Sequence, residues 1–137
     1  MFRAFLAVFA MLSLAAPAAH AASKAPKECT AIGEGPDARE DLIRKAPSCD
    51  AAMEQFEACA YGASGDTGLG QIVREKCEAD FLRRLGKPER AAYAAAINRC
   101  NRKYRNESGT MYRSFEAFCR AEVAQKYSRR AKKTGAR

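Results

Sequence analysis

The sequence predicts an all-α fold, a small disulfide-braced antiparallel bundle of about four helices with an N-terminal appendage. Apolar residues recur at helical spacing in four long segments, and no segment keeps the two-residue alternation typical of a strand. Glycine and proline separate these segments. Six cysteines follow an N-terminal apolar stretch, and an even number of exported cysteines favours three disulfides. These are Cys29, Cys49, Cys59, Cys77, Cys100 and Cys119.

The first 21 residues have the pattern of an export signal. Arg3 gives a positive start, residues 4–16 are uncharged and apolar, and Ala19-His20-Ala21 matches a signal-peptidase site. The apolar stretch is shorter than the roughly 18 residues of a membrane-spanning helix. We therefore expect residues 1–21 to be a cleaved signal peptide and the mature protein to be periplasmic or secreted.

Residues 22–48 are expected to form an N-terminal arm, because prolines and glycines interrupt this segment. One short helix is expected within it, over Asp37–Lys45. Asp37 can cap this helix, and Leu42 and Ile43 can anchor it to the rest of the protein.

Residues 49–130 are expected to form the helical domain. A serine or aspartate precedes the first helix, and Pro88 suits the first turn of the third. Gly62 and Gly86 are placed to end the first two helices. Short connections predict that consecutive helices pack antiparallel. The predicted helices cover residues 50–61, 67–85, 88–104 and 108–130.

Apolar stripes on these helices define the predicted core. The first three stripes comprise Met53, Phe56 and Ala60; then Leu69, Ile72, Val73, Cys77, Phe81 and Leu85; then Tyr93, Ile97, Cys100 and Tyr104. The fourth comprises Met111 or Tyr112, Phe115, Phe118 or Cys119, Val123 and Tyr127.

The cysteine pairing stays partly open, since six cysteines allow fifteen arrangements. A helix between Cys49 and Cys59 would separate them by about 15 Å, which is too far for a bridge. Two schemes remain, and each leaves Cys29–Cys49 to hold the arm. The favoured scheme has Cys59–Cys77 with Cys100–Cys119, and the other has Cys77–Cys100 with Cys59–Cys119.

The mature chain lacks the histidine of several common catalytic sites, and paired carboxylates are the catalytic groups that it still offers. Its only histidine, His20, is removed with the signal, which excludes histidine-based triads and histidine metal or haem sites. No C-x-x-C pair occurs, so neither a redox pair nor a zinc knuckle is indicated. We expect a protein that is not an enzyme and holds no cofactor or metal.

The positive charge is concentrated at the C-terminus. The formal net charge is +8, yet residues 22–125 hold 17 basic and 16 acidic side chains. The last twelve residues contain no acid and six bases, and residues 131–137 are expected to be a disordered tail. Such a tail can contact anionic lipid or lipopolysaccharide, although we favour a solvated chain end. The six bases are Lys126, Arg129, Arg130, Lys132, Lys133 and Arg137.

Two segments resemble the LprI-type lysozyme-inhibitor family of small exported bacterial helical proteins. The resemblance lies in Cys100 within a basic helix, Gly109-Thr110-Met111-Tyr112, Cys119-Arg120-Ala121-Glu122 and Arg130, and in the segment 49–59. It implies Cys100–Cys119 and Cys49–Cys59 bridges and lysozyme as partner. Inhibition of a cationic lysozyme needs acidic surface. The acidic clusters that can supply it are Glu34, Asp37, Glu40 and Asp41, and Glu75, Glu78 and Asp80.

The sequence thus predicts a monomeric, non-enzymatic, exported binding or accessory protein of the lysozyme-inhibitor-like kind. The alternative is an envelope-surface protein whose basic tail contacts anionic lipid or lipopolysaccharide. A third hypothesis is a carrier that holds an apolar ligand between helices. Nucleic acid is disfavoured as a partner, because Tyr127 is the only aromatic residue within the basic segment 126–137 and the protein is expected to be exported.

Overall fold

The computed structural model describes residues 28–30 and 36–135. Within them the chain forms five α-helices and one short 3-10 helix and no strand, which confirms the all-α class. The predicted signal peptide lies outside the described residues. The helices are α1 (Pro36–Lys45), α2 (Cys49–Cys59), α3 (Asp66–Glu78), η1 (Leu82–Arg84), α4 (Lys87–Tyr104) and α5 (Thr110–Gly135).

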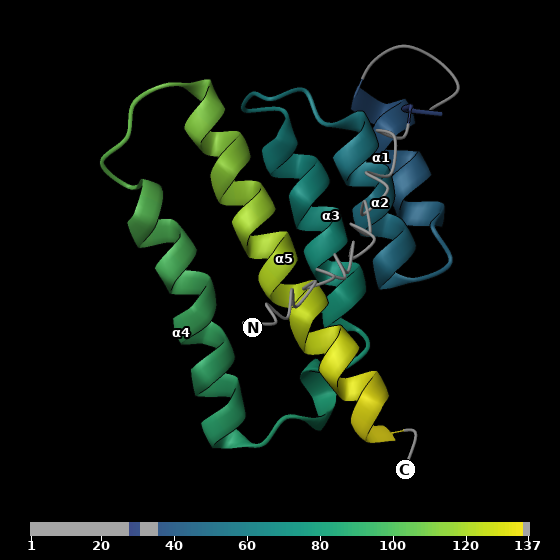
Figure 1. The fold of residues 1–137 in the computed structure, drawn as a ribbon, viewed down its shortest axis with the longest axis vertical. Helices are drawn as coiled ribbons and strands as arrows, with labels where there is room; N and C mark the ends of the chain where they lie inside the picture. Colours follow the sequence, from purple (N-terminus) through teal and green to yellow (C-terminus); the bar gives the residue numbers. More distant parts are fainter. Residues whose placement is uncertain (1–27, 31–35, 136–137) are drawn as a thin grey trace, which may run out of the picture.

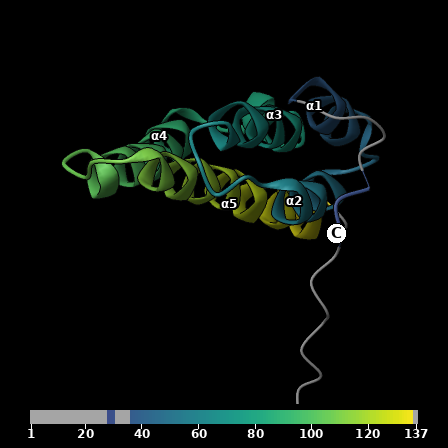
Figure 2. The same cartoon turned by 90° about the horizontal axis from the view of Figure 1, so that it is seen from above.

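The helices form two layers. Seen from above, α4, α3 and α1 lie in one row and α5 and α2 in the other (Figure 2). Helix α5 lies between α4 and α3, and it has the most extensive contacts with α3 and then with α4 (Figure 1). Helix α4 is therefore held to the rest of the protein mainly through α5.

Only some of the helices that follow one another in the chain pack antiparallel. Helices α4 and α5 do so, as expected, because Cys100 meets Cys119 and Tyr93 meets Tyr127 further along. Helices α3 and α4 do not pair in this way, because α4 packs mainly on α5, which lies between them in the view of Figure 1. Instead, α3 and α5 lie parallel (Figure 1).

Two serine–aspartate hydrogen bonds fix this parallel register. Ser114 donates to Asp66 over 2.5 Å, and Ser128 donates to Asp80 four helical turns further on. Between them the buried face of α5 carries only small residues. This stripe comprises Ser114, Ala117, Ala121, Ala124 and Ser128.

The predicted stripe of α5 was wrong at Phe115, which is 43% exposed. Of the two alternatives at its start, Tyr112 is half-buried and Met111 is 49% exposed. A glycine on α3 explains why small residues face inward instead. A Cβ atom on Gly70 would lie 3.0 Å from the Ala117 Cβ and 3.1 Å from its carbonyl oxygen. The two backbones approach so closely that large side chains do not fit between them.

The other predicted stripes are mostly buried, as expected. Phe56 is fully buried and stacks on Phe118 of α5, with ring centroids 4.1 Å apart. The α3 stripe is buried as far as Phe81, but the helix does not reach Leu85. Helix α3 ends at Glu78, and a turn and η1 follow before α4 begins.

All six cysteines are paired, as predicted, but only one predicted bridge forms. Cys100–Cys119 is present, whereas the other bridges are Cys29–Cys59 and Cys49–Cys77. Because α2 and α3 are antiparallel, the start of α2 lies beside the end of α3, which joins Cys49 to Cys77. The expected Cys29–Cys49 and Cys59–Cys77 bridges and the Cys49–Cys59 bridge implied by the resemblance are therefore wrong. Three disulfides indicate an oxidising compartment.

The C-terminal residues also differ from the prediction. Helix α5 continues to Gly135, so residues 131–135 are helical and are not a disordered tail. Their basic side chains consequently have fixed places around the helix.

Candidate functional site

One end of the molecule combines an apolar pocket with a basic rim. The pocket lies where the turn after α3, the start of α4 and the end of α5 meet, and its volume is about 490 Å³. We call it the end pocket. It is lined by Phe81, Arg84, Leu85, Glu89, Ala92, Tyr127, Arg130, Ala131, Thr134 and Gly135.

The rings of Phe81 and Tyr127 form the apolar base of the end pocket, and the buried ring of Tyr93 packs against both. The ring of Tyr127 lies 5.5 Å from that of Phe81 and 5.0 Å from that of Tyr93. The Tyr93 hydroxyl donates to Glu78 over 2.7 Å. Burial, and then this hydrogen bond, raise the pKa of Tyr93 well above its ordinary value of 10.0, so the hydroxyl stays protonated.

The connection before α4 brings Arg84 to the rim of the end pocket, and Arg90 is held against the lining residue Leu85. Arg90 donates to the carbonyl oxygens of Leu85 and Arg83, and Arg84 donates to that of Asp80. Carbonyl acceptors hold these side chains in place but leave their charge uncompensated. Among the described residues Glu89 is the only acid that lines the pocket, and it accepts a hydrogen bond from the Gly86 amide at the start of α4.

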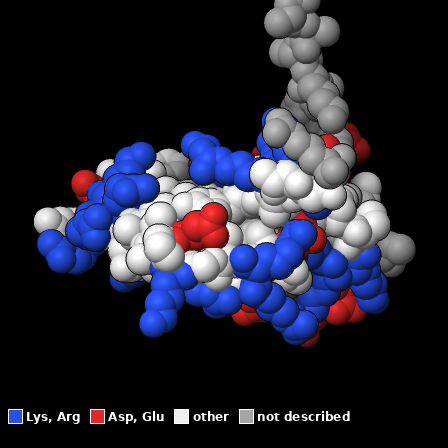
Figure 3. Space-filling view, turned by 90° about the horizontal axis from the view of Figure 1, so that it is seen from below, with Lys and Arg blue, Asp and Glu red and all other residues white. Residues whose placement is uncertain are grey.

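Figure 3 shows this end of the molecule, where blue basic side chains surround a white area with fewer red acidic groups. The surface therefore offers apolar contact at its centre and positive charge at its edge. Such a combination suits an anionic amphiphile or an anionic lipid surface.

The six C-terminal basic residues do not act as one group. Arg129 pairs with Asp50 at 2.6 Å, and Lys132 pairs with Asp80 at 3.2 Å. Burial tends to raise the pKa of Asp50, but the hydrogen bond and charge of Arg129 outweigh it and lower this pKa below 3.8. These two cations thus hold α5 against the neighbouring elements.

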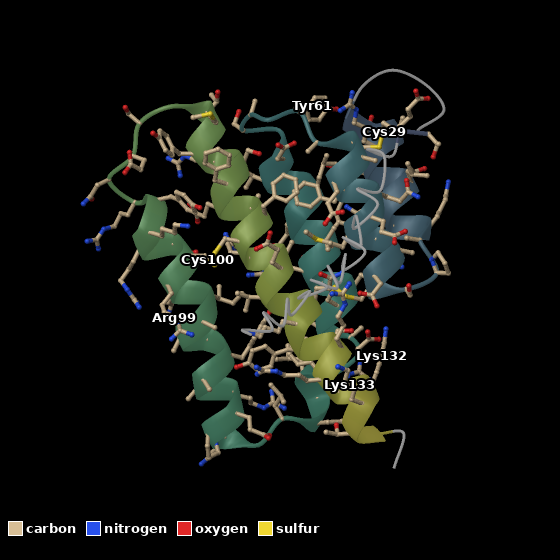
Figure 4. The ribbon with its side chains drawn as sticks, viewed as in Figure 1. Cys29, Tyr61, Arg99, Cys100, Lys132 and Lys133 are labelled. Carbon is tan, nitrogen blue, oxygen red and sulfur yellow. A yellow bond between two sulfur atoms is a disulfide. The ribbon has the colours of Figure 1, made fainter. Side chains whose placement is uncertain are left out.

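The remaining tail cations lie on another side of α5. Lys126, Arg130 and Lys133 are exposed and follow helical spacing. Arg130 lies 5.6 Å from the Tyr127 ring centroid, and the three form no ion pair with any residue in 28–30 or 36–135. The side chains of the adjacent Lys132 and Lys133 project from the last turns of α5 (Figure 4). The last tail cation, Arg137, lies outside the described residues.

The sequence reasoning missed the cations before α4. The stretch Arg83-Arg84-Leu85-Gly86-Lys87-Pro88-Glu89-Arg90 contains four bases in eight residues. That density of basic residues could have predicted a second basic cluster. Its position beside the C-terminal end of α5 depends on the fold and could not be predicted from the sequence.

The predicted acidic clusters are largely engaged within the protein. Glu40 pairs with Arg44, and Asp41 pairs with Lys45. Glu34 lies outside the described residues. In the second cluster each acid has a partner: Glu75 accepts from Gln71, Glu78 from Tyr93, and Asp80 from Ser128.

The part of the chain that the structure describes contains no group of three His, Cys, Asp or Glu side chains placed to hold a metal. None of the helices in that same part has the length and apolar character needed to cross a membrane.

Comparison with known proteins yields no relative. No family model matches the chain, and no curated protein and no solved structure matches it significantly.

Proposed function

We propose that the protein is an exported, non-enzymatic binding protein of the cell envelope that attaches to anionic lipid through its basic end. The observation that supports this proposal is the end pocket, with its aromatic base and its rim of unpaired cations. The proposed location is the periplasm, after cleavage of residues 1–21. The three disulfides agree with such an oxidising compartment.

In this proposal charge and apolar contact act together. Arg130 and Lys133 attract lipid headgroups, and each basic residue near an anionic surface contributes about 1 kcal/mol. The end pocket then accepts part of an acyl chain against Phe81 and Tyr127. A single weak apolar contact gains selectivity for anionic lipid because the rim repels cations.

Binding to vesicles tests the proposal. The full mature chain is floated with vesicles of phosphatidylcholine alone or of phosphatidylcholine mixed with phosphatidylglycerol. We expect binding to the mixed vesicles only. Arg130→Gln/Lys133→Gln should weaken it by roughly 30-fold, which corresponds to about 2 kcal/mol for two cations.

The chain offers a matched control for this experiment. Arg129→Gln/Lys132→Gln removes the same net charge from the same helix, but from side chains that pair with Asp50 and Asp80. We expect a smaller loss of vesicle binding from this control. Equal losses from both double variants, or no preference for anionic vesicles, would overturn the proposal.

Lysozyme inhibition is a second candidate, implied by the family resemblance. The Cys100–Cys119 bridge is the observation that favours it, since the resemblance implies this bridge. A lysozyme activity assay with the purified protein tests it. Unchanged lysozyme activity at a large excess of protein would remove this candidate.

A further inference from the structure

A second basic hollow lies away from the end pocket, between α3 and α5. Its volume is about 150 Å³, which has room for several water molecules and hence for a phosphate group. We call it the arginine pocket. It is lined by Thr67, Gly70, Gln71, Arg74, Arg113, Glu116, Ala117 and Arg120.

The close approach of α3 and α5 creates the arginine pocket. Gly70 and Ala117 meet at its floor, where no large side chain fits. The same approach places Arg74 of α3 beside Arg113 and Arg120 of α5. Three guanidinium groups from two helices therefore face one small space.

The charges of these arginines are only partly compensated within the protein. Arg120 lies 3.7 Å from Glu116, and Arg74 lies 3.6 Å from Glu78. Both distances exceed that of a hydrogen bond. Glu78 also accepts from Tyr93, so its charge is shared. The immediate group thus holds three cations and two carboxylates.

Partial burial makes this incomplete compensation significant. The side chains of Arg74 and Arg120 are only 20% and 26% exposed. The buried Arg74 Nε atom faces the Glu78 carboxylate at 3.6 Å and has no partner within hydrogen-bond distance. Among the described residues, neither a backbone carbonyl nor a side chain accepts a hydrogen bond from the three guanidinium groups. Unused arginine donors at a partly desolvated position favour an oxoanion.

A wider hollow of about 610 Å³ continues from the arginine pocket towards α4, and Arg113 and Glu116 line both. Its α4 wall offers amide and phenol groups, including Asn101, whose Oδ1 atom is buried without a partner. These are groups that bind sugar hydroxyls. The remaining lining residues are Asn98, Arg102, Tyr104, Arg105 and Glu107.

We infer that the arginine pocket binds the phosphate of a phosphate-bearing ligand whose polar remainder lies in the wider hollow. The guanidinium groups of Arg113 and Arg120 donate to the phosphate oxygens, and Arg74 supplies further positive charge. The site is independent of lipid attachment, because it shares no lining residue with the end pocket.

Calorimetric titration tests the inference, with inorganic phosphate as the first probe and chloride at equal ionic strength as the reference. We expect phosphate binding that Arg120→Gln weakens by roughly tenfold or more, as the loss of a charged hydrogen bond predicts. The matched control is Arg99→Gln, an exposed arginine on α4 that lines neither hollow (Figure 4). Thermal unfolding without phosphate verifies that both variants fold.

Glucose 6-phosphate and glucose distinguish the possible sources of the phosphate. Tighter binding of the sugar phosphate, with none of glucose, supports the full inference. Equal binding of sugar phosphate and inorganic phosphate would remove the wider hollow from the site and leave free phosphate as ligand. Absence of phosphate binding, or equal losses from Arg120→Gln and Arg99→Gln, would overturn the inference. Arg130→Gln/Lys133→Gln should not alter phosphate binding, which separates this test from that of lipid attachment.

Discussion

At the scale of single residues, Asp66 joins three parts of the fold. Its fully buried carboxylate accepts hydrogen bonds from the amides of Tyr61 and Gly62, over 2.7 and 2.9 Å, and from the Ser114 hydroxyl. The loop before α3, the first turn of α3 and the start of α5 therefore share one acceptor. A buried carboxylate is tolerated here because several donors surround it.

Replacement of this carboxylate should destabilise the fold. In Asp66→Asn an amide nitrogen must face one of the three donors, which leaves buried groups unsatisfied at a cost of about 1–3 kcal/mol. Urea unfolding of the two proteins measures the difference. Asp41→Asn serves as control, because Asp41 forms only an exposed ion pair with Lys45 and should change stability by less than about 0.5 kcal/mol. Equal stability of Asp66→Asn and wild type would contradict this role.

Asp50 predicts a pH dependence of stability. Its pKa in the folded protein is below the ordinary 3.8, since Arg129 favours the ionised form. The pairing therefore stabilises the protein fully above pH 3.8 and is lost as the pH falls through the lower folded pKa.

Stability as a function of pH tests this dependence. Wild type should exceed Asp50→Asn near neutral pH by about 0.5 kcal/mol, since the pair is half exposed. The difference should shrink in acid. A difference that persists unchanged well below pH 3.8 would show that the ionised carboxylate is not its source.

At the scale of helices, the contact between α3 and α5 depends on Gly70. A Cβ atom there would press on Ala117 at 3.0 Å, and on its backbone, which cannot move aside freely. We expect Gly70→Ala to cost about 1–3 kcal/mol through overpacking, beyond the roughly 0.5–1 kcal/mol that alanine gains in a helix.

Gly68→Ala is the control on the same helix. Its Cβ atom would meet only the end of the Glu40 side chain, which can move. Thermal unfolding should therefore show Gly68→Ala at or above the wild-type midpoint and Gly70→Ala below it. The opposite order would mean that the close approach does not limit the side chain at position 70.

The comparison with the sequence shows which elements local patterns predict. The starts of α1 and α4 lie within one residue of the prediction, because Asp37 and Pro88 both favour a first helical turn. Asp37 lies inside that turn and does not cap it, since α1 begins at Pro36 and α4 at Lys87. The buried face of α5 was not predictable in this way. Apolar stripes identify large side chains, whereas the contact with α3 uses alanine and serine and leaves Met111 and Phe115 exposed.

For the candidate site, too, the sequence predicted the residue types but not how the fold arranges them. The tail cations are visible in the sequence, but their division into paired and unpaired sides depends on Asp50 and Asp80, which are distant along the chain. Local patterns do not report contacts across such separations. For the aromatic residues the sequence favoured core packing over a ligand pocket, since the pocket above Phe81 and Tyr127 depends on where η1 lies.

At the scale of the whole molecule, the disulfides divide between two regions. Cys29–Cys59 and Cys49–Cys77 brace the N-terminal part with α2 and α3, whereas Cys100–Cys119 joins α4 to α5 (Figure 4). Because α4 contacts the rest of the protein mainly through α5, the Cys100–Cys119 bridge stabilises the position of α4 in particular. It keeps the α4 wall of the wider hollow and of the end pocket in place.

Removal of that bridge should therefore loosen α4 first. In Cys100→Ser/Cys119→Ser we expect a loss of about 3 kcal/mol, the usual effect of a disulfide that closes a loop of this length. Amide hydrogen exchange should accelerate most in residues 87–104 and least in α2 and α3, since the other two bridges remain. Cys29→Ser/Cys59→Ser, which also removes one bridge, should leave exchange in α4 unchanged. Uniform acceleration across all helices in the first variant would mean that α4 and the remainder unfold as one cooperative unit, in which case the bridge stabilises the whole domain and not one wall of its pockets.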